Sequence, residues 1–298
     1  MIHLAEKNQC TGCAACYNSC PKSAISMKPD NGGFLYPYIN DELCIKCNQC
    51  SKSCPVISPL ISKSEYEPRA FVAQHKDDDI RKESTSGGAF TALAQIVIEN
   101  GGVVFGASME DGFVVKHTLA TTIDELAKFR NSKYVQSEIG KSFSAVKEYL
   151  EKGIQVLFSG TPCQIEGLLG YLHEKYNNLV TVDIVCHSIP SPAVFKKYMD
   201  LQISKYPQVD KVVFRDKQRG YDYSTIALYG KKKTDDKKCF YRRGSESDLW
   251  FRSFLPGLCD RENCYNCYFQ EYPRKSDITI WDCFAISDIY PEFDDNAG

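Results

Sequence analysis

From residue 69 to the end of the sequence, short apolar runs alternate with segments in which apolar residues recur at helical spacing. Runs rich in valine, isoleucine and phenylalanine predict strands at 70–75, 103–107, 113–119, 155–159, 180–185, 212–215 and 225–229. Apolar residues at helical spacing predict helices at 89–100, 123–129, 141–152, 164–176, 193–206 and 247–254. Because strands and helices alternate, we expect an α/β domain with a mixed sheet over residues 69–298.

The first 58 residues follow a different pattern. The segments 24–27 and 34–39 flank Asn31-Gly32-Gly33, and this arrangement predicts a β-hairpin. Residues 59–68, with the sequence PLISKSEYEP, combine prolines, serines and charges, as linkers commonly do. We therefore divide the chain into a small domain over 1–58, a linker over 59–68 and a larger domain over 69–298.

Eight of the 15 cysteines lie in two copies of the spacing C-x2-C-x2-C-x3-C-P. The first copy contains Cys10, Cys13, Cys16 and Cys20, and the second contains Cys44, Cys47, Cys50 and Cys54. This is the ligand spacing of proteins with two 4Fe–4S clusters, in which the fourth cysteine of each run ligates the other cluster. One cluster is therefore expected on Cys10, Cys13, Cys16 and Cys54, and the other on Cys20, Cys44, Cys47 and Cys50.

Structural zinc is the alternative for these runs, because zinc sites also use paired C-x2-C knuckles. Zinc leaves the third cysteine of each run and the proline after each fourth cysteine unexplained. Residues 1–58 resemble a bacterial two-cluster ferredoxin along their whole length, which implies an α+β ferredoxin-like dicluster domain. The runs thus predict one-electron transfer.

Composition excludes several classes of partner. The formal net charge is −2 and charged residues make up 25% of the chain, so no strong field favours nucleic acid. The longest nearly unbroken apolar run, 89–98, is far shorter than the roughly 20 residues of a membrane span. Thiolates and iron–sulfur clusters persist in a reducing compartment, so we expect a cytoplasmic protein.

Two loops of the larger domain precede predicted helices. The small residues of 84–89, with the sequence STSGGA, suit the phosphate of a flavin, although an ordinary helix cap explains them too. In 159–164, Pro162 suits the first helical position, and Cys163 then lies in the first turn. The helix dipole there is expected to lower the pKa of the thiol, whereas a buried inert cysteine is the alternative.

The remaining cysteines suggest a further site. Cys186 and His187 follow the predicted strand 180–185, and the carboxyl ends of such strands commonly bind ligands. Cys264 and Cys267 form another C-x2-C pair, for which Cys163 and Cys186 are available as further ligands. A third 4Fe–4S cluster, a zinc ion and ordinary core cysteines all remain open on spacing alone.

Six separated motifs, in this order, resemble the family of coenzyme F420 hydrogenase/dehydrogenase beta subunits. They are STSGGAFT (84–91), NSKYVQS (131–137), LFSGTPCQIEGL (157–168), VDIVCHSIPSP (182–192), VVFRDK (212–217) and CYNCYF…RKSDITIWD (264–282). The resemblance covers essentially all of residues 1–298, and it includes the N-terminal two-cluster ferredoxin arrangement. Relatives continue beyond the present end, which suggests a C-terminal truncation of the domain.

The resemblance implies a flavoprotein, with FAD as the usual flavin and FMN as the alternative, and a third 4Fe–4S cluster held by Cys163, Cys186, Cys264 and Cys267. It implies flavin contacts from Ser86, Gly87, Gly88, Thr91, Ser132, Lys133, Tyr134, Gln136 and Ser137. Arg215 and Lys217 are the candidates for an anionic part of the flavin or substrate. His187, Lys133 and Tyr134 are the candidate catalytic residues.

The function that follows is an iron–sulfur flavoprotein oxidoreductase. It would pass electrons between a ferredoxin or another redox protein and a small hydride donor or acceptor, such as coenzyme F420, through a flavin. The alternative is a non-catalytic electron-transfer subunit that serves a partner enzyme.

Overall fold

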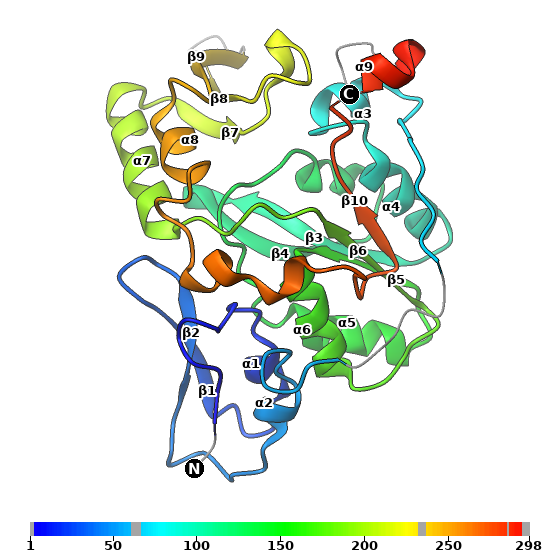
Figure 1. Ribbon diagram of the computed structural model, residues 1–298, viewed down its shortest axis with the longest axis vertical. Coiled ribbons are helices and arrows are strands. Elements are labelled where there is room, and N and C mark those ends of the chain that lie inside the picture. The colour runs from blue at the N-terminus through cyan, green and yellow to red at the C-terminus, as the bar shows by residue number, and fades with distance from the viewer. Residues whose placement is uncertain (1–2, 61–66, 232–236, 285, 294–298) are drawn as a thin grey trace.

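The computed structural model describes residues 3–60, 67–231, 237–284 and 286–293 (Figure 1). Its N-terminal part comprises α1 (Ala15–Ser19), β1 (Ile25–Pro29), β2 (Leu35–Ile39) and α2 (Gln49–Lys52). β1 and β2 pair antiparallel, which confirms the predicted hairpin. Gly33 has a φ of 76° in the turn between them, a conformation that glycine adopts without strain. The predicted linker includes residues 61–66, which lie outside the described residues.

A five-stranded sheet forms the centre of the larger part, with the order β10-β6-β5-β3-β4. Its strands are β3 (Val103–Glu110), β4 (Val114–Ala120), β5 (Val156–Gly160), β6 (Leu179–Ile184) and β10 (Ile278–Ile280). β10, β6, β5 and β3 run parallel, and β4 pairs antiparallel with β3. The prediction of a mixed sheet is therefore confirmed.

Helices cover both faces of this sheet because its strands are apolar on both sides. On one face, α4 (Ala89–Glu99) packs with Val104 and Leu157 in a common core. On the other face, α5 (Ser142–Glu151) and α6 (Pro162–Leu172) pack with Phe105 and Phe158. Residues that are neighbours along β3 and β5 thus face opposite layers, as strand geometry requires.

A second sheet, which the sequence did not indicate as separate, lies beyond the first. It contains β7 (Val209–Val213), β8 (Thr225–Lys231) and β9 (Lys237–Gly244), all antiparallel. α7 (Pro192–Lys205) and α8 (Leu249–Phe254) pack against it, with Phe195 and Trp250 in the shared core. Among the described residues of the larger part, the predicted mixed sheet therefore accounts for one of two sheets.

Several element predictions were wrong or incomplete. Residues 70–75 form no strand: Phe71 is 76% exposed, and the backbone bonds to the loop before α4 through His75 N and Gly87 O at 2.6 Å. Residues 123–129 contain a 3-10 helix (Asp124–Phe129) in place of an α-helix. The short elements α3 (Asp78–Glu83), β10 and α9 (Ile286–Ile289) were not predicted.

The N-terminal part and the central sheet share one hydrophobic core. Cys13, Ala14 and Ala15 belong to the same buried cluster as Phe143 and Leu168. In Figure 1 the blue N-terminal part lies beside α6, and the orange segment after α8 runs above the blue part toward α6. The N-terminal part is thus packed into the protein and has a fixed position relative to α6.

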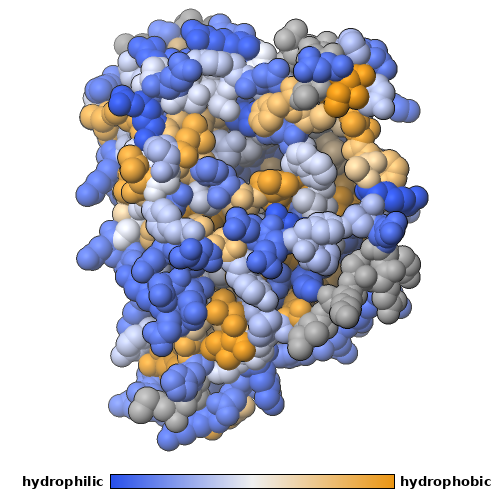
Figure 2. Space-filling view, viewed as in Figure 1, coloured by the Kyte–Doolittle hydropathy of each residue, from blue (hydrophilic) through white to orange (hydrophobic). Residues whose placement is uncertain are grey.

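Apolar side chains on the surface do not form one continuous area on the face drawn in Figure 2. Figure 2 shows a largely hydrophilic face on which apolar side chains occur in several separate groups. Within the described ranges, no helix combines the length and the apolar character that crossing a bilayer requires.

Candidate functional site

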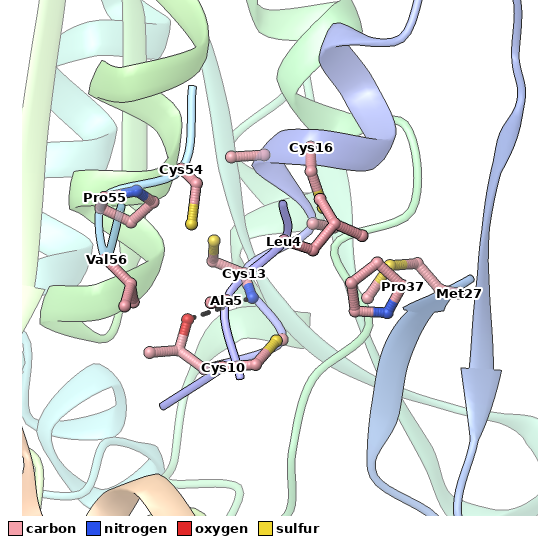
Figure 3. Close-up of a pocket in the computed structure, with 14 residues that line it drawn as sticks. Leu4, Ala5, Cys10, Cys13, Cys16, Met27, Pro37, Cys54, Pro55 and Val56 are labelled. Carbon is pink, nitrogen blue, oxygen red and sulfur yellow. Dashed lines mark hydrogen bonds between the residues drawn. The ribbon is translucent and has the colours of Figure 1, made fainter. Parts of the chain in front are cut away.

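Four cysteines line one pocket in the N-terminal part (Figure 3). Cys10 and Cys13 lie in the loop before α1, Cys16 lies in the first turn of α1, and Cys54 arrives from the segment after α2. The remaining lining is mostly apolar and includes Leu4, Met27, Pro37 and Val56. This is the crossed set of four thiols that the spacing predicts for one cluster, in a setting that limits water.

The loop of this pocket depends on a glycine. Gly12 has a φ of +72°, and a Cβ there would lie 2.7 Å from Gln136 Nε2 and 3.0 Å from Leu35 O. Burial raises the pKa of the Cys13 thiol to about 12, and nearby thiols add to the rise. Iron coordination would offset this cost, because a metal-bound thiol is deprotonated.

A second pocket brings together the other four N-terminal cysteines. Cys20, Cys44, Cys47 and Cys50 line it with Ile25, Ile39 and Ile45. Cys50 is buried, whereas Cys47 is exposed. This second crossed set therefore lies closer to solvent than the first pocket, where Cys10 and Cys13 are both buried.

A third set of thiols gathers at the carboxyl edge of the central sheet. Cys163 follows β5 at the start of α6, and Cys186 follows β6. Because β5 and β6 are parallel neighbours, these ends adjoin. Cys264 and Cys267 approach from the segment after α8. Burial, and then the charges of the neighbouring thiols, raise the pKa of Cys186 and of Cys264.

The expectation for the Cys163 pKa was wrong. Pro162 does occupy the first turn of α6, and Gln164 Oε1 accepts a hydrogen bond from Thr161 N at 3.0 Å, which caps the helix. Burial nevertheless raises the pKa of Cys163 to about 11, although the Thr161 hydroxyl contact lowers it. Desolvation thus outweighs the hydrogen bonds and the Arg261 charge that lower the pKa of Cys163.

Two glycines on α6 allow close contact between that helix and the N-terminal part. A Cβ on Gly167 would lie 2.8 Å from Cys13 Cβ and 2.9 Å from Cys13 Sγ. A Cβ on Gly170 would lie 2.6 Å from the carbonyl oxygen of Ser53. Cys163 lies one turn before Gly167 and therefore shares its face of the helix. Cys163 and Cys13 are near enough for the charge of Cys163 to raise the pKa of Cys13.

A buried arginine, which sequence reasoning missed, joins the same region. Arg261 Nε donates to Cys10 O at 2.8 Å, Nη2 donates to Leu35 O at 3.1 Å, and Nη1 donates to Gln136 Oε1 at 3.2 Å. The only signal in the sequence was its place, three residues before Cys264. Arg261 thereby ties the segment of the third thiol set to the first pocket.

Three loops predicted to contact a flavin converge elsewhere. Thr85 Oγ1 and Ser132 Oγ lie 2.8 Å apart, which joins the loop before α4 to the 131–137 segment. Lys217 Nζ donates to Ser86 O at 2.9 Å and to Arg81 O at 2.7 Å. The predicted residues Gly87, Gly88 and Thr91 belong to this loop and to the first turn of α4. Gly88 has a φ of +80° at the start of that helix, which favours glycine.

The charged candidates of this second region already have partners. Arg215 Nη1 donates to Asp282 Oδ2 at 2.9 Å and lies 3.5 Å from the Tyr134 hydroxyl. Lys133 Nζ donates to the carbonyl oxygens of Arg130 and Asn131. Burial lowers the pKa of Lys133 to about 7, and the charge of Lys211 adds to the decrease.

The remaining candidates lie apart from the loop before α4. Gln136 Nε2 is 3.5 Å from Thr11 O, and Ser137 Oγ accepts from Gln164 Nε2 at 2.9 Å, so both lie where α6 meets the first pocket. His187 is exposed, with its Nε2 3.2 Å from Leu255 O. The structure thus distributes the candidate residues over two regions.

Comparison with known proteins connects both parts of the chain to described families. Residues 70–143 and 154–296 match the N-terminal and C-terminal models described as coenzyme F420 hydrogenase/dehydrogenase, beta subunit. Residues 9–57 match a 4Fe–4S dicluster domain.

The individual relatives are more distant. The chain is 23% identical over 226 residues to a subunit of the F(420)H(2) dehydrogenase of Methanosarcina mazei, covering 72% of this chain and 62% of that protein. It is 40% identical over 48 residues to the ferredoxin-type protein NapF of Escherichia coli, covering 16% of this chain and 29% of that one. A chain of the F420-reducing NiFe hydrogenase complex from Methanosarcina barkeri matches at 20% identity with a TM-score of 0.37, over 56% of this chain and 57% of that chain. That likeness is too distant to establish a shared fold.

Proposed function

The chain belongs to the family of coenzyme F420 hydrogenase/dehydrogenase beta subunits and carries a 4Fe–4S dicluster domain, and we propose that it is an electron-transfer subunit of an oxidoreductase. The observation that carries the proposal is the order in which three sets of thiols follow one another through the protein, whose N-terminal part and central sheet share one core. The solvent-near pocket of Cys47, the buried pocket of Cys13 and the set around Cys163 succeed one another.

The residues proposed to hold the clusters form three groups of four. They are Cys20, Cys44, Cys47 and Cys50; Cys10, Cys13, Cys16 and Cys54; and Cys163, Cys186, Cys264 and Cys267. When bound, such clusters carry one electron at a time, and a flavin connects single electrons to hydride transfer.

The protein's own residues hold the first pocket close to the third set of thiols. Gly167 permits Cys13 to lie directly against α6, one turn from Cys163. Asn18 further fixes the N-terminal part, because its Nδ2 donates to Gly140 O at 2.9 Å. We retain 1–58 and 69–298 as proposed domains, although they share a core. A ferredoxin or another redox protein would then exchange electrons at the exposed Cys47 side, and a cytoplasmic location remains our expectation.

A finer proposal is that the larger domain binds a flavin, FAD or its alternative FMN, and exchanges hydride with coenzyme F420 or another small carrier. Ser86, Ser132 and Tyr134 support it, because their loops converge around Arg215 and Lys217. Lys133 would hold or release a proton near neutral pH, since burial lowers its pKa to about 7. Tyr134 and His187 remain the other candidate catalytic residues.

A second candidate function is electron delivery to a catalytic partner subunit without a flavin on this chain. This second function is favoured because the cations proposed to bind the flavin already have partners. Arg215 forms an ion pair with Asp282, and Lys217 donates to two carbonyl oxygens. A flavin phosphate would have to replace those contacts.

Cofactor content of anaerobically reconstituted protein tests the proposal. We expect about twelve iron atoms and about twelve sulfides per chain from three clusters, whereas about eight of each would remove the third site. Release of flavin by acid, followed by reduction of coenzyme F420, would support the hydride-transferring version. Full iron without flavin would instead select the subunit that delivers electrons to a partner, and iron near zero would refute both versions.

A further inference from the structure

A fully buried cation lies between the first pocket and the segment that bears Cys264. Arg261 is 0% exposed and is among the largest fully buried side chains. The Tyr36 ring centroid lies 4.0 Å from its guanidinium carbon. Among the residues that the structure describes, no carboxylate forms an ion pair with it. Its hydrogen bonds go to two carbonyl oxygens, to Gln136 and toward the Cys10 sulfur.

A buried guanidinium of this kind requires a compensating negative charge. Removing a charge from water without a partner costs several kcal/mol, and carbonyl dipoles offset only part of that cost. Arg261 Nη2 lies 3.8 Å from Cys10 Sγ, so it is aimed at the pocket proposed to hold a cluster. A cluster with four thiolates is anionic, and it becomes more negative when it accepts an electron. The guanidinium therefore stabilises the reduced cluster more than the oxidised one.

The second pocket has a different electrostatic setting. The cation in its lining is Lys22, which is exposed. Water and salt screen an exposed ammonium far more than a buried guanidinium. Each of the two N-terminal pockets is thus lined by four cysteines, but the cation beside the first pocket is buried and the cation beside the second is exposed.

We propose that Arg261 is a tuning residue that raises the reduction potential of the cluster beside Cys10 above that of the cluster in the second pocket. This inference rests on the proposed cluster sites. One electron from a low-potential carrier, such as a reduced ferredoxin, adds to the cluster, and the carrier is oxidised by one electron. Electrons consequently rest at the site packed against Gly167, one helical turn from Cys163.

Potentiometric titration of the anaerobic, reconstituted full chain, followed by electron paramagnetic resonance, tests this role. In Arg261→Gln we expect the reduction equilibrium of the first cluster to fall by about tenfold, which is about 59 mV for one electron. The second cluster serves as the internal reference, and a Cys44→Ser variant assigns its signal. Lys22→Gln is the matched control, and it is expected to shift either cluster by less than about twofold.

Arg261→Lys keeps the proposal testable if Arg261→Gln fails to load its clusters. A buried lysine can lose its proton, so the potential of the first cluster should fall as the pH rises in this variant and stay level in the wild type. A merely structural arginine would not produce that pH dependence. An unchanged potential in loaded Arg261→Gln, or a level potential in Arg261→Lys, would overturn the proposal. Wild-type protein with fewer than about eight irons would refute the cluster sites themselves.

Discussion

Replacing Gly167 by alanine tests whether α6 and the first pocket need direct contact. Within a helix the change to alanine alone should stabilise the protein by about 1 kcal/mol. The added Cβ, however, would lie 2.8 Å from Cys13 Cβ and 2.9 Å from Cys13 Sγ. Carbon atoms in contact prefer about 3.5–4.0 Å, so the helix and the loop must separate by roughly 1 Å.

Overpacking of this kind typically costs about 1–3 kcal/mol. We therefore expect Gly167→Ala to lower the free energy of unfolding by zero to about 2 kcal/mol, whereas helix propensity alone predicts an increase. The displacement also acts on Cys13, whose sulfur cannot move freely if it is tied to iron. We accordingly expect a lower iron and sulfide content together with the lower stability.

Anaerobic urea unfolding and iron analysis provide the assay. Gly153→Ala is the matched control, because Gly153 has a φ of +74° and a Cβ added there would meet no atom within 4 Å. That control should lose about 1–2 kcal/mol through backbone strain and keep its full iron content. A Gly167→Ala protein that is more stable than wild type and fully loaded would refute the reasoning.

Three further changes test other parts of the structure. Cys186→Ser should remove about four of about twelve irons per chain, and retention of all iron on analysis would contradict the third site. Lys133 has a pKa of about 7 in place of the ordinary 10.5, so the unfolded chain binds more protons between these values and stability should rise with pH across that window. Urea unfolding at several pH values should show a smaller rise in Lys133→Met, and an identical slope would exclude a titrating Lys133. Asn18→Ala should lose about 1–3 kcal/mol in the same assay, because the Gly140 carbonyl and the Ser144 hydroxyl lose their partner; a loss near zero would mean that water replaces the amide.

The sequence predicted elements whose signal is local. The pattern around Asn31-Gly32-Gly33 specified the hairpin, and the apolar runs specified β3, β5 and β6 to within a few residues. The strand predicted at 70–75 was wrong because a short apolar run does not form a strand without a neighbouring strand to pair with, and Phe71 stays exposed. β10 was missed because three residues carry too little pattern, and its parallel partner β6 lies far away in the sequence.

The candidate site divides in the same way. Cysteine spacing indicated which four cysteines line each N-terminal pocket, because such spacing is a property of short loops, and their role as cluster ligands stays a prediction. The role of Arg261 could not be predicted in this way, because a lone arginine acquires it only through contacts with Cys10 and Leu35, which are far away in the sequence. The pKa direction of Cys163 was wrong for a related reason: burial depends on everything that packs around the thiol.

The shared core of Ala14, Ala15 and Leu168 has a consequence for biosynthesis. The cysteine-bearing loops leave the ribosome first, whereas α5 and α6, which cover Cys13, are translated later. An interval therefore exists in which the thiols of the first pocket are open to an iron–sulfur assembly factor. Closure of α6 ends that interval, so the order of synthesis itself provides a window for metal insertion.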